Sequence, residues 1–152
     1  MNEEVKYISY EEAISVYAKM IDASDGGFDG VRDEGGIRAA LEFVQNDMYY
    51  PNFSDKLCSL VYKFCSGHYF NDGNKRIALT LGTYFLHKNS YFWQATIFMR
   101  QMESIVYHVA ASNIDKDLLL RIMTCFMNGE DYDEELKIDI ANAMSKGELG
   151  IN

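Results

Sequence analysis

Apolar residues recur at helical spacing along nearly the whole chain. The first stripe, Ala13, Ile14, Tyr17 and Ile21, follows Ser9-Tyr10-Glu11-Glu12, in which Ser and Glu stand at the spacing of a helix-capping box. Similar stripes predict further helices from Asp33 or Glu34 to Val44, from Ser54 or Asp55 to Gly67, and over 74–88, 94–111, 115–127 and 132–146. We see no internal repeat and no strand–helix–strand alternation. The pattern predicts one all-α domain, a compact bundle of about six to seven helices.

One break in the helical pattern stands out, from Gln45 to Phe53. It holds the single proline of the chain, Pro51, which removes a backbone donor and disfavours helix at the residue before it. The break leaves room for one short β-hairpin.

Composition and charge narrow the class of protein. The 152 residues are 48% hydrophobic with one Pro and 11 Gly, which excludes disordered and collagen-like chains. Lys and Arg total 14 against 23 Asp and Glu, a net charge of −9. An acidic surface repels phosphate backbones and anionic lipids. We therefore expect neither nucleic acid nor a membrane as a direct partner.

The cysteines and the N-terminal residues indicate a cytoplasmic protein. Cys58, Cys65 and Cys125 form no short paired motif, and the seven-residue spacing of the first two puts them on one helix face. We interpret them as core thiols in a reducing compartment. The first residues are acidic without an apolar signal-peptide core, and no apolar run reaches the ~20 residues that span a bilayer.

The segment between the third and fourth predicted helices contains more polar and charged residues than a connection between two helices needs. It reads Gly67-His68-Tyr69-Phe70-Asn71-Asp72-Gly73-Asn74-Lys75-Arg76. Asp72-Gly73-Asn74 favours a tight turn whose backbone N–H groups converge, and a helix N-terminus directly after it attracts anions. Lys75 and Arg76 add positive charge there, so the segment predicts a phosphate site.

Three further side chains in this segment suit phosphate chemistry. The imidazole of His68 can act as a general base near neutral pH. Asp72 offers a hard oxygen to a Mg²⁺ ion that arrives with nucleotide phosphates. Phe70, between polar neighbours, is expected to anchor the loop in the core. Taken singly, His68 reads as a structural histidine and Asp72 as a helix cap; their combination favours a site.

The nine residues 68–76, HYFNDGNKR, resemble the active-site motif of the Fic/Doc family, H-x-F-x-(D/E)-(G/A)-N-(G/K)-R. The resemblance runs from about residue 5 to residue 92. It includes Gly30-Val31-Arg32-Asp33-Glu34-Gly35 upstream and Ile77-Ala78-Leu79 downstream. It implies the all-α Fic fold, with a single Fic/Doc domain over 1–152.

The resemblance also implies a role for each residue of the motif. His68 would deprotonate a target hydroxyl, and Asp72 would bind the Mg²⁺ that accompanies ATP, the co-substrate. The anion-binding turn would be Gly73 and Asn74, with phosphate contacts from Lys75 and Arg76. The break after the second helix would be the family's flap, which holds a target segment by strand-like pairing. The flap residues would be Gln45, Asn46, Asp47, Met48, Tyr49 and Tyr50.

Two positions bear on which group is transferred. AMP-transferring members have Gly where this chain has Lys75, and a second Arg where it has Leu79. The Lys form is similar to the Doc (death-on-curing) branch, toxins that move the γ-phosphate of ATP to a protein hydroxyl, with elongation factor Tu the known kind of target. The alternatives are an adenylyltransferase using the same site, an inactive Fic-fold interaction module, and an RNA-cleaving toxin, which the charge disfavours.

The sequence also bears on regulation. Some members of the family inhibit themselves through a helix with (S/T)-x-x-x-E-(G/N), yet no Glu of this chain has Ser or Thr four residues before it. We therefore expect a separate antitoxin as partner, and the oligomeric state stays open.

Overall fold

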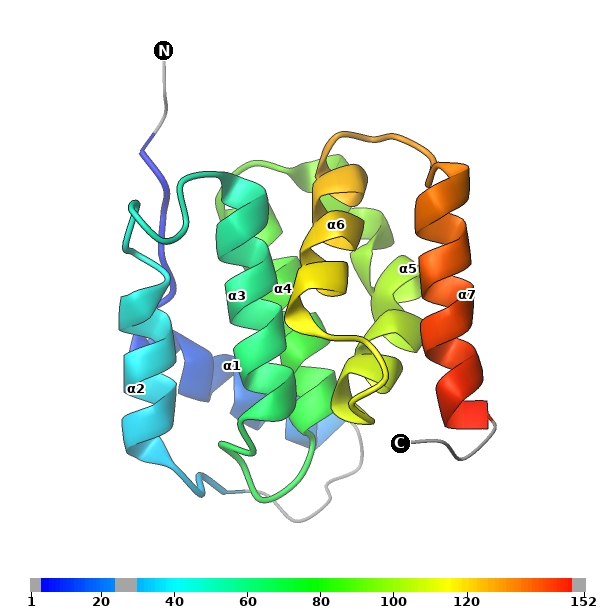
Figure 1. Cartoon of the computed structure of the whole chain (residues 1–152). Helices are drawn as coiled ribbons and strands as arrows, with labels where there is room; N and C mark the ends of the chain where they lie inside the picture. The colour runs from blue at the N-terminus through cyan, green and yellow to red at the C-terminus, as the bar shows by residue number, and fades with distance from the viewer. Residues whose placement is uncertain (1–3, 24–29, 149–152) are drawn as a thin grey trace.

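The computed structural model describes residues 4–23 and 30–148, and within them the chain is a bundle of seven helices (Figure 1). They are α1 (Tyr10–Ala23), α2 (Glu34–Phe43), α3 (Phe53–Ser66), α4 (Asn74–Lys88), α5 (Phe92–Ala110), α6 (Lys116–Met127) and α7 (Glu134–Glu148). The prediction of an all-α fold is confirmed. The described part of the chain holds one isolated β-bridge, between Val31 and Phe70.

Side-chain caps explain where the helices begin. Before α1, Ser9 and Glu12 exchange two hydrogen bonds of 3.1 Å, each side chain accepting from the other's backbone N–H, so the predicted capping box is confirmed. Asp115 caps α6 by accepting from the Leu118 N–H at 2.8 Å.

The start of α3 corrects an expectation. The helix begins at Phe53 with Asn52 as its cap, before the predicted start at Ser54 or Asp55, and the Asp55 carboxylate reaches back to accept the Asn52 N–H at 2.9 Å.

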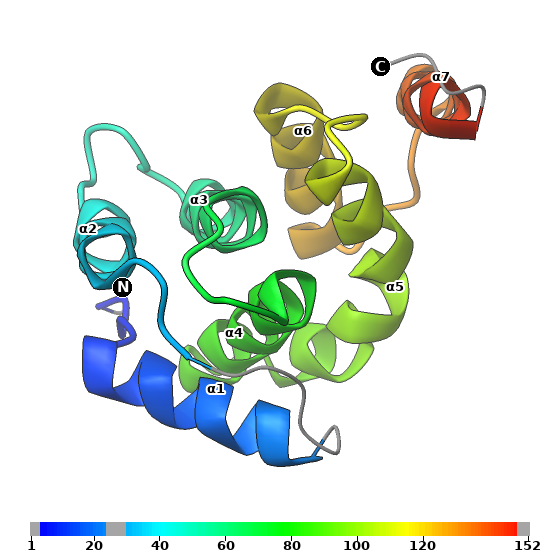
Figure 2. The same cartoon turned by 90° about the horizontal axis from the view of Figure 1, so that it is seen from below.

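Helix α4 lies at the centre of the bundle, packed against α1, α3 and α5 (Figure 2). Its buried residues cover more than one face: Ile77, Ala78, Leu81, Gly82, Phe85 and Leu86. Gly82 lets α5 approach closely, since a Cβ there would lie 2.6 Å from Phe98 Cε2. The N-terminus of α4, where the motif lies, is therefore fixed to the most enclosed helix of the bundle.

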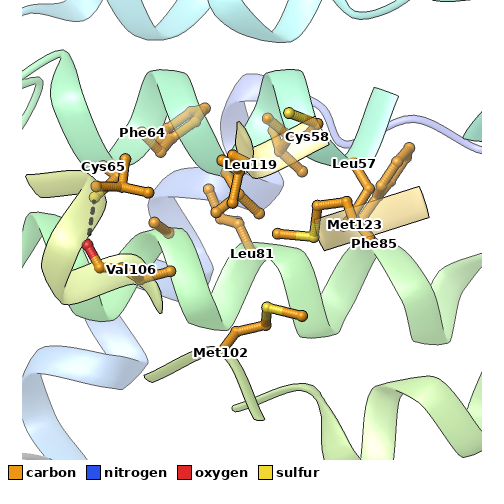
Figure 3. Packing of buried hydrophobic residues seen from close by; sticks show 14 of the residues in the cluster. Leu57, Cys58, Phe64, Cys65, Leu81, Phe85, Met102, Val106, Leu119 and Met123 are labelled. Atoms are coloured by element: carbon orange, nitrogen blue, oxygen red, sulfur yellow. Dashed lines mark hydrogen bonds between the residues drawn. The ribbon is translucent and has the colours of Figure 1, made fainter. Parts of the chain in front are cut away.

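Two cysteines belong to the apolar core that α3, α4, α5 and α6 share (Figure 3). Cys58 and Cys65 are buried, and the Cys65 thiol donates to the Val106 carbonyl at 3.4 Å. Burial raises the pKa of Cys58 to about 12 and that of Cys65 to about 11, so both stay protonated thiols at neutral pH. These two core thiols were predicted correctly, whereas Cys125 is half-buried.

The described helices include none that is both long and apolar enough to cross a bilayer.

The segment between α2 and α3 forms turns, not the hairpin that the sequence left room for. The Asn46 side-chain oxygen accepts the N–H groups of Met48 and Tyr49 at 2.9 and 3.2 Å. The Asn46 carbonyl accepts the Tyr50 N–H at 2.9 Å. Local acceptors thus take the donors that a paired strand would need.

Candidate active site

The motif residues lie in the loop between α3 and α4 and on the first turn of α4 (Figure 2). His68 follows the last turn of α3 directly, and its φ of +52° is in the left-handed region. This conformation costs a non-glycine residue roughly 1 kcal/mol or more, and such residues cluster at functional sites. The side chain of His68 is exposed. The strained turn therefore presents an imidazole to solvent at the rim of the loop.

Phe70 holds the middle of the loop in the core. Its side chain is 1% exposed and its ring stacks on that of Tyr17 with centroids 4.0 Å apart. The Asn74 carboxamide donates to the Phe70 carbonyl at 3.0 Å and accepts the Phe70 N–H at 3.2 Å. The side chain of Asn74 therefore shapes the loop, which leaves its backbone N–H for a ligand.

The turn before α4 is built on a residue whose backbone conformation favours glycine. Gly73 has φ +81°, and a Cβ there would stand 3.1 Å from Met20 Cε and 3.2 Å from Arg76 Nη2. The first hydrogen bond into the helix runs from the Ile77 N–H to the Gly73 carbonyl at 2.8 Å.

The backbone N–H groups of residues 74–76 have no acceptor among the described residues. They lie at the positive end of the α4 dipole, an arrangement that can bind an anion.

Charged side chains surround these amides. The Asp72 carboxylate is half-exposed; Oδ1 accepts the Gly73 N–H at 2.8 Å and Oδ2 lies 3.5 Å from Arg76 Nη2. Lys75 is exposed on the same first turn. The loop thus holds one carboxylate against two cations and three unpaired amides, which favours an anion over a free cation.

The donor set also fits a Mg²⁺ ion that arrives with phosphates. Magnesium bound with a nucleotide takes one or two protein carboxylates and completes its shell with phosphate and water oxygens. Asp72 supplies one such carboxylate at the edge of the anion site. In the described ranges no three His, Cys, Asp or Glu side chains gather to hold a metal.

A segment that sequence reasoning did not assign to the site lies along the loop. The N–H groups of Arg32 and Asp33 donate to the Tyr69 carbonyl at 2.8 and 3.0 Å, and the Asn71 N–H donates to the Gly30 carbonyl at 3.0 Å. Residues 30–33 therefore lie beside the motif and are joined to it by backbone hydrogen bonds. The resemblance covered these residues, and no side-chain pattern marked their position.

The ring of Tyr69 fixes the loop to two helices. It lies so close to Gly36 of α2 and to Gly67 after α3 that a Cβ on either would come within 2.7 Å and 2.4 Å of Tyr69 Cε1. It also meets Phe64 edge to face at 5.2 Å. Two glycines thus make the space that the tyrosine fills.

The structure does not bring the expected flap residues to the loop. They precede α3, whereas His68 follows it, and a helix of 14 residues separates its ends by about 20 Å (Figure 1). Buried Lys56 holds this segment by donating to the Val44 carbonyl at 3.1 Å and to Asp47 at 2.7 Å. Gln45 and Asp47 line a hollow at that far end. All six residues, Gln45, Asn46, Asp47, Met48, Tyr49 and Tyr50, lie in this far segment.

Comparison with known proteins identifies similar sequences. A sequence profile of the Fic/DOC family matches residues 7–86. The chain is 33% identical over 96 residues to Toxin Doc of Mycolicibacterium smegmatis (strain ATCC 700084 / mc(2)155), covering 60% of this chain and 74% of that protein. It is 35% identical over 88 residues to Protein kinase doc of Escherichia phage P1, covering 56% of this chain and 69% of that protein. The profile match contains α1 to α3, the loop, and most of α4.

Proposed function

Because the chain belongs to the Fic/DOC family, we propose that it is a nucleotide-dependent transferase, specifically a Doc-like kinase that moves the γ-phosphate of ATP to a Ser or Thr hydroxyl of a protein. The observation that carries the proposal is the turn at the start of α4. There the free N–H groups of 74–76 and the cations Lys75 and Arg76 follow the loop that begins with an exposed His68. The similarity to a toxin and to a protein kinase supports the same reading.

The residues divide the work of phosphoryl transfer as follows. His68 accepts the proton of the target hydroxyl while its oxygen forms a bond to the γ-phosphorus. The bond from the γ-phosphorus to the bridging oxygen breaks, and ADP leaves with that electron pair. The turn amides, Lys75 and Arg76 neutralise negative charge on the phosphoryl oxygens. A Mg²⁺ ion bound with the nucleotide would add positive charge there, and Asp72 is the residue that would hold it.

The nature of the transferred group rests on Lys75. AMP-transferring relatives have glycine there, which leaves space for a phosphate against bare backbone. An exposed lysine on the first turn of α4 adds a full charge where the terminal phosphate would lie. The position of the second arginine is occupied by Leu79. Both features favour transfer of phosphate over transfer of AMP.

The target and the regulator follow from the same proposal. Elongation factor Tu is the first protein to test as target, and a separately encoded antitoxin is the expected partner. We place target docking at residues 30–33 instead of the 45–50 segment, because the former lie beside the loop. Val31 is 38% exposed there and itself forms the β-bridge with Phe70.

The test asks which phosphate moves. The purified protein is incubated with Mg²⁺, elongation factor Tu and, in parallel, bacterial lysate, using ATP labelled at the γ or the α position. His68→Ala should abolish labelling and keep ATP binding, whereas His87→Ala, an exposed histidine at the far end of α4, should label normally. Label from γ-ATP alone supports the kinase. Label from α-ATP means AMP transfer, and loss of ATP binding in folded His68→Ala refutes the role of His68.

A further inference from the structure

Tyr17 reaches the loop from α1 with both its ring and its hydroxyl. The ring stacks on Phe70 at an interplanar angle of 16°. The hydroxyl donates to the backbone carbonyl of Asp72 at 2.8 Å, across 55 positions of sequence. The residue is 4% exposed, so the hydrogen bond is sheltered from water.

That carbonyl belongs to the peptide that enters the anion-binding turn. A trans peptide is planar, with its C=O and N–H pointing in opposite directions, so holding the Asp72 oxygen also sets the direction of the Gly73 N–H. The Gly73 N–H in turn donates to Asp72 Oδ1 at 2.8 Å. Tyr17 is thereby linked, through one rigid peptide, to the carboxylate of Asp72.

The link matters because the two residues that form this peptide restrain it weakly by themselves. Gly73 has no Cβ and adopts φ +81°, a region where glycine meets little resistance to a change of φ. Asp72 is half-exposed, and its ion pair with Arg76 spans 3.5 Å. Neither feature restrains the peptide strongly, whereas a sheltered hydroxyl does.

We infer that Tyr17 is a positioning residue, whose hydroxyl orients the Asp72–Gly73 peptide and so keeps the Asp72 carboxylate at the edge of the phosphate site. The inference rests on the proposed function for its catalytic meaning, and on the ring stacking and the two hydrogen bonds described above for its geometry. Tyr17 itself touches no reacting atom. Its effect should fall on the use of Mg²⁺ more than on the proton transfer by His68.

The experiment compares Tyr17→Phe, which keeps the ring, with a matched control. Tyr84→Phe also removes a hydroxyl hydrogen bond between α4 and α1, the one to Glu12, at a distance from the loop. The first measurement uses the ¹⁵N-glycine spectrum without nucleotide. In Tyr17→Phe the Gly73 amide should shift and exchange with solvent about three to ten times faster, the effect of one lost hydrogen bond. The other glycine amides report whether the fold is kept.

The second measurement is transfer as a function of Mg²⁺. Tyr17→Phe should raise the half-saturating Mg²⁺ concentration about threefold to tenfold with a smaller change in kcat, and Tyr84→Phe should match the wild type. If the chemical shift and exchange rate of the Gly73 amide are unchanged in Tyr17→Phe, the inference is wrong, even if the wild type is a kinase. A wild type without transfer, but with the Gly73 change in Tyr17→Phe, refutes the proposed function and leaves the positioning role standing.

Discussion

The carboxamide of Asn74 pairs with both backbone groups of Phe70, donating to its carbonyl at 3.0 Å and accepting its N–H at 3.2 Å. A side chain thus takes the place of a paired strand and closes the loop between the two residues. The arrangement explains how a nine-residue motif keeps a fixed path with one β-bridge to support it. It also separates the two functions of Asn74, whose side chain shapes the loop while its N–H faces the anion site.

Asn74→Ala should therefore lower both stability and transfer. Loss of two hydrogen bonds at a half-buried site costs about 1–3 kcal/mol in the free energy of unfolding, measured with urea. Asn89→Ala is the control, because Asn89 pairs in the same way with the N–H and carbonyl of Lys6, at the other end of α4. Transfer per folded molecule should drop at least tenfold in Asn74→Ala and stay normal in Asn89→Ala. Equal activities would contradict a role of this pair in shaping the site.

Gly73→Ala should lower transfer by more than the backbone strain of an alanine at positive φ explains. Gly73 and Gly129 both have positive φ, +81° and +68°, so alanine is strained at each by roughly 1 kcal/mol. A Cβ at Gly129 meets nothing within 4 Å, whereas at Gly73 it presses on Arg76 Nη2. We expect similar melting temperatures and a tenfold or greater loss of transfer in Gly73→Ala alone. Normal transfer by Gly73→Ala would show that Arg76 tolerates displacement.

Lys75→Gly should slow the transfer of γ-phosphate. Removing one charge beside a transferring group costs about tenfold or more in rate. Lys116→Gly is the control, since it removes a first-turn lysine from α6 and introduces the same helix-weakening residue. Single-turnover rates with γ-labelled ATP measure both. If both variants keep the wild-type rate, Lys75 does not determine the chemistry.

Acid should weaken the contact between α1 and α4 at Glu12. Hydrogen bonds from Lys88 at 2.8 Å and from the Tyr84 hydroxyl lower the pKa of Glu12 from 4.5 to about 2. A carboxyl whose pKa is lower in the folded than in the unfolded protein stabilises the fold at pH values above its unfolded-state pKa. This stabilisation is lost as the pH falls from about 5 towards 2. Its contribution is on the order of 2 kcal/mol, after allowance for partial exposure.

Urea unfolding at several pH values measures this contribution. The wild type should lose stability between pH 5 and 2 more steeply than Glu12→Gln. Glu11→Gln, a change at the exposed neighbouring residue, should follow the wild type. Parallel pH profiles for wild type and Glu12→Gln would rule out the linkage.

The sequence predicts the helices well because their caps are local. Ser9 with Glu12 and Asp115 with Leu118 act within three positions, so the pattern of residue types is sufficient to find them. The residues expected to form the flap lie away from the loop for a geometric reason. Sequence order places residues 45–50 near α3, and the length of α3 carries them to the far end of the bundle.

The role of Tyr17 was beyond sequence reasoning for another reason. A tyrosine in an apolar stripe reads as core, and its ring is indeed buried. Its hydroxyl partner is a backbone carbonyl, which has no residue type to recognise, at a position 55 residues away. The packing of Tyr69 against Gly36 and Gly67 could not be predicted from the sequence either. A glycine that makes room for a side chain cannot be told from a glycine that forms a turn by its residue type alone.

The peripheral place of α7 has a consequence for how the molecule opens. This helix packs on α5 and α6 alone among the described helices, through Leu136, Ile140 and Ala143, while the loop is joined to α4 in the interior. Its backbone amides should therefore exchange with deuterium through a local, low-energy detachment, while the hydrogen-bonded amides of α4, from Ile77 onwards, should exchange only through global unfolding. The chain would then detach its last helix reversibly while the motif at the start of α4 keeps its structure.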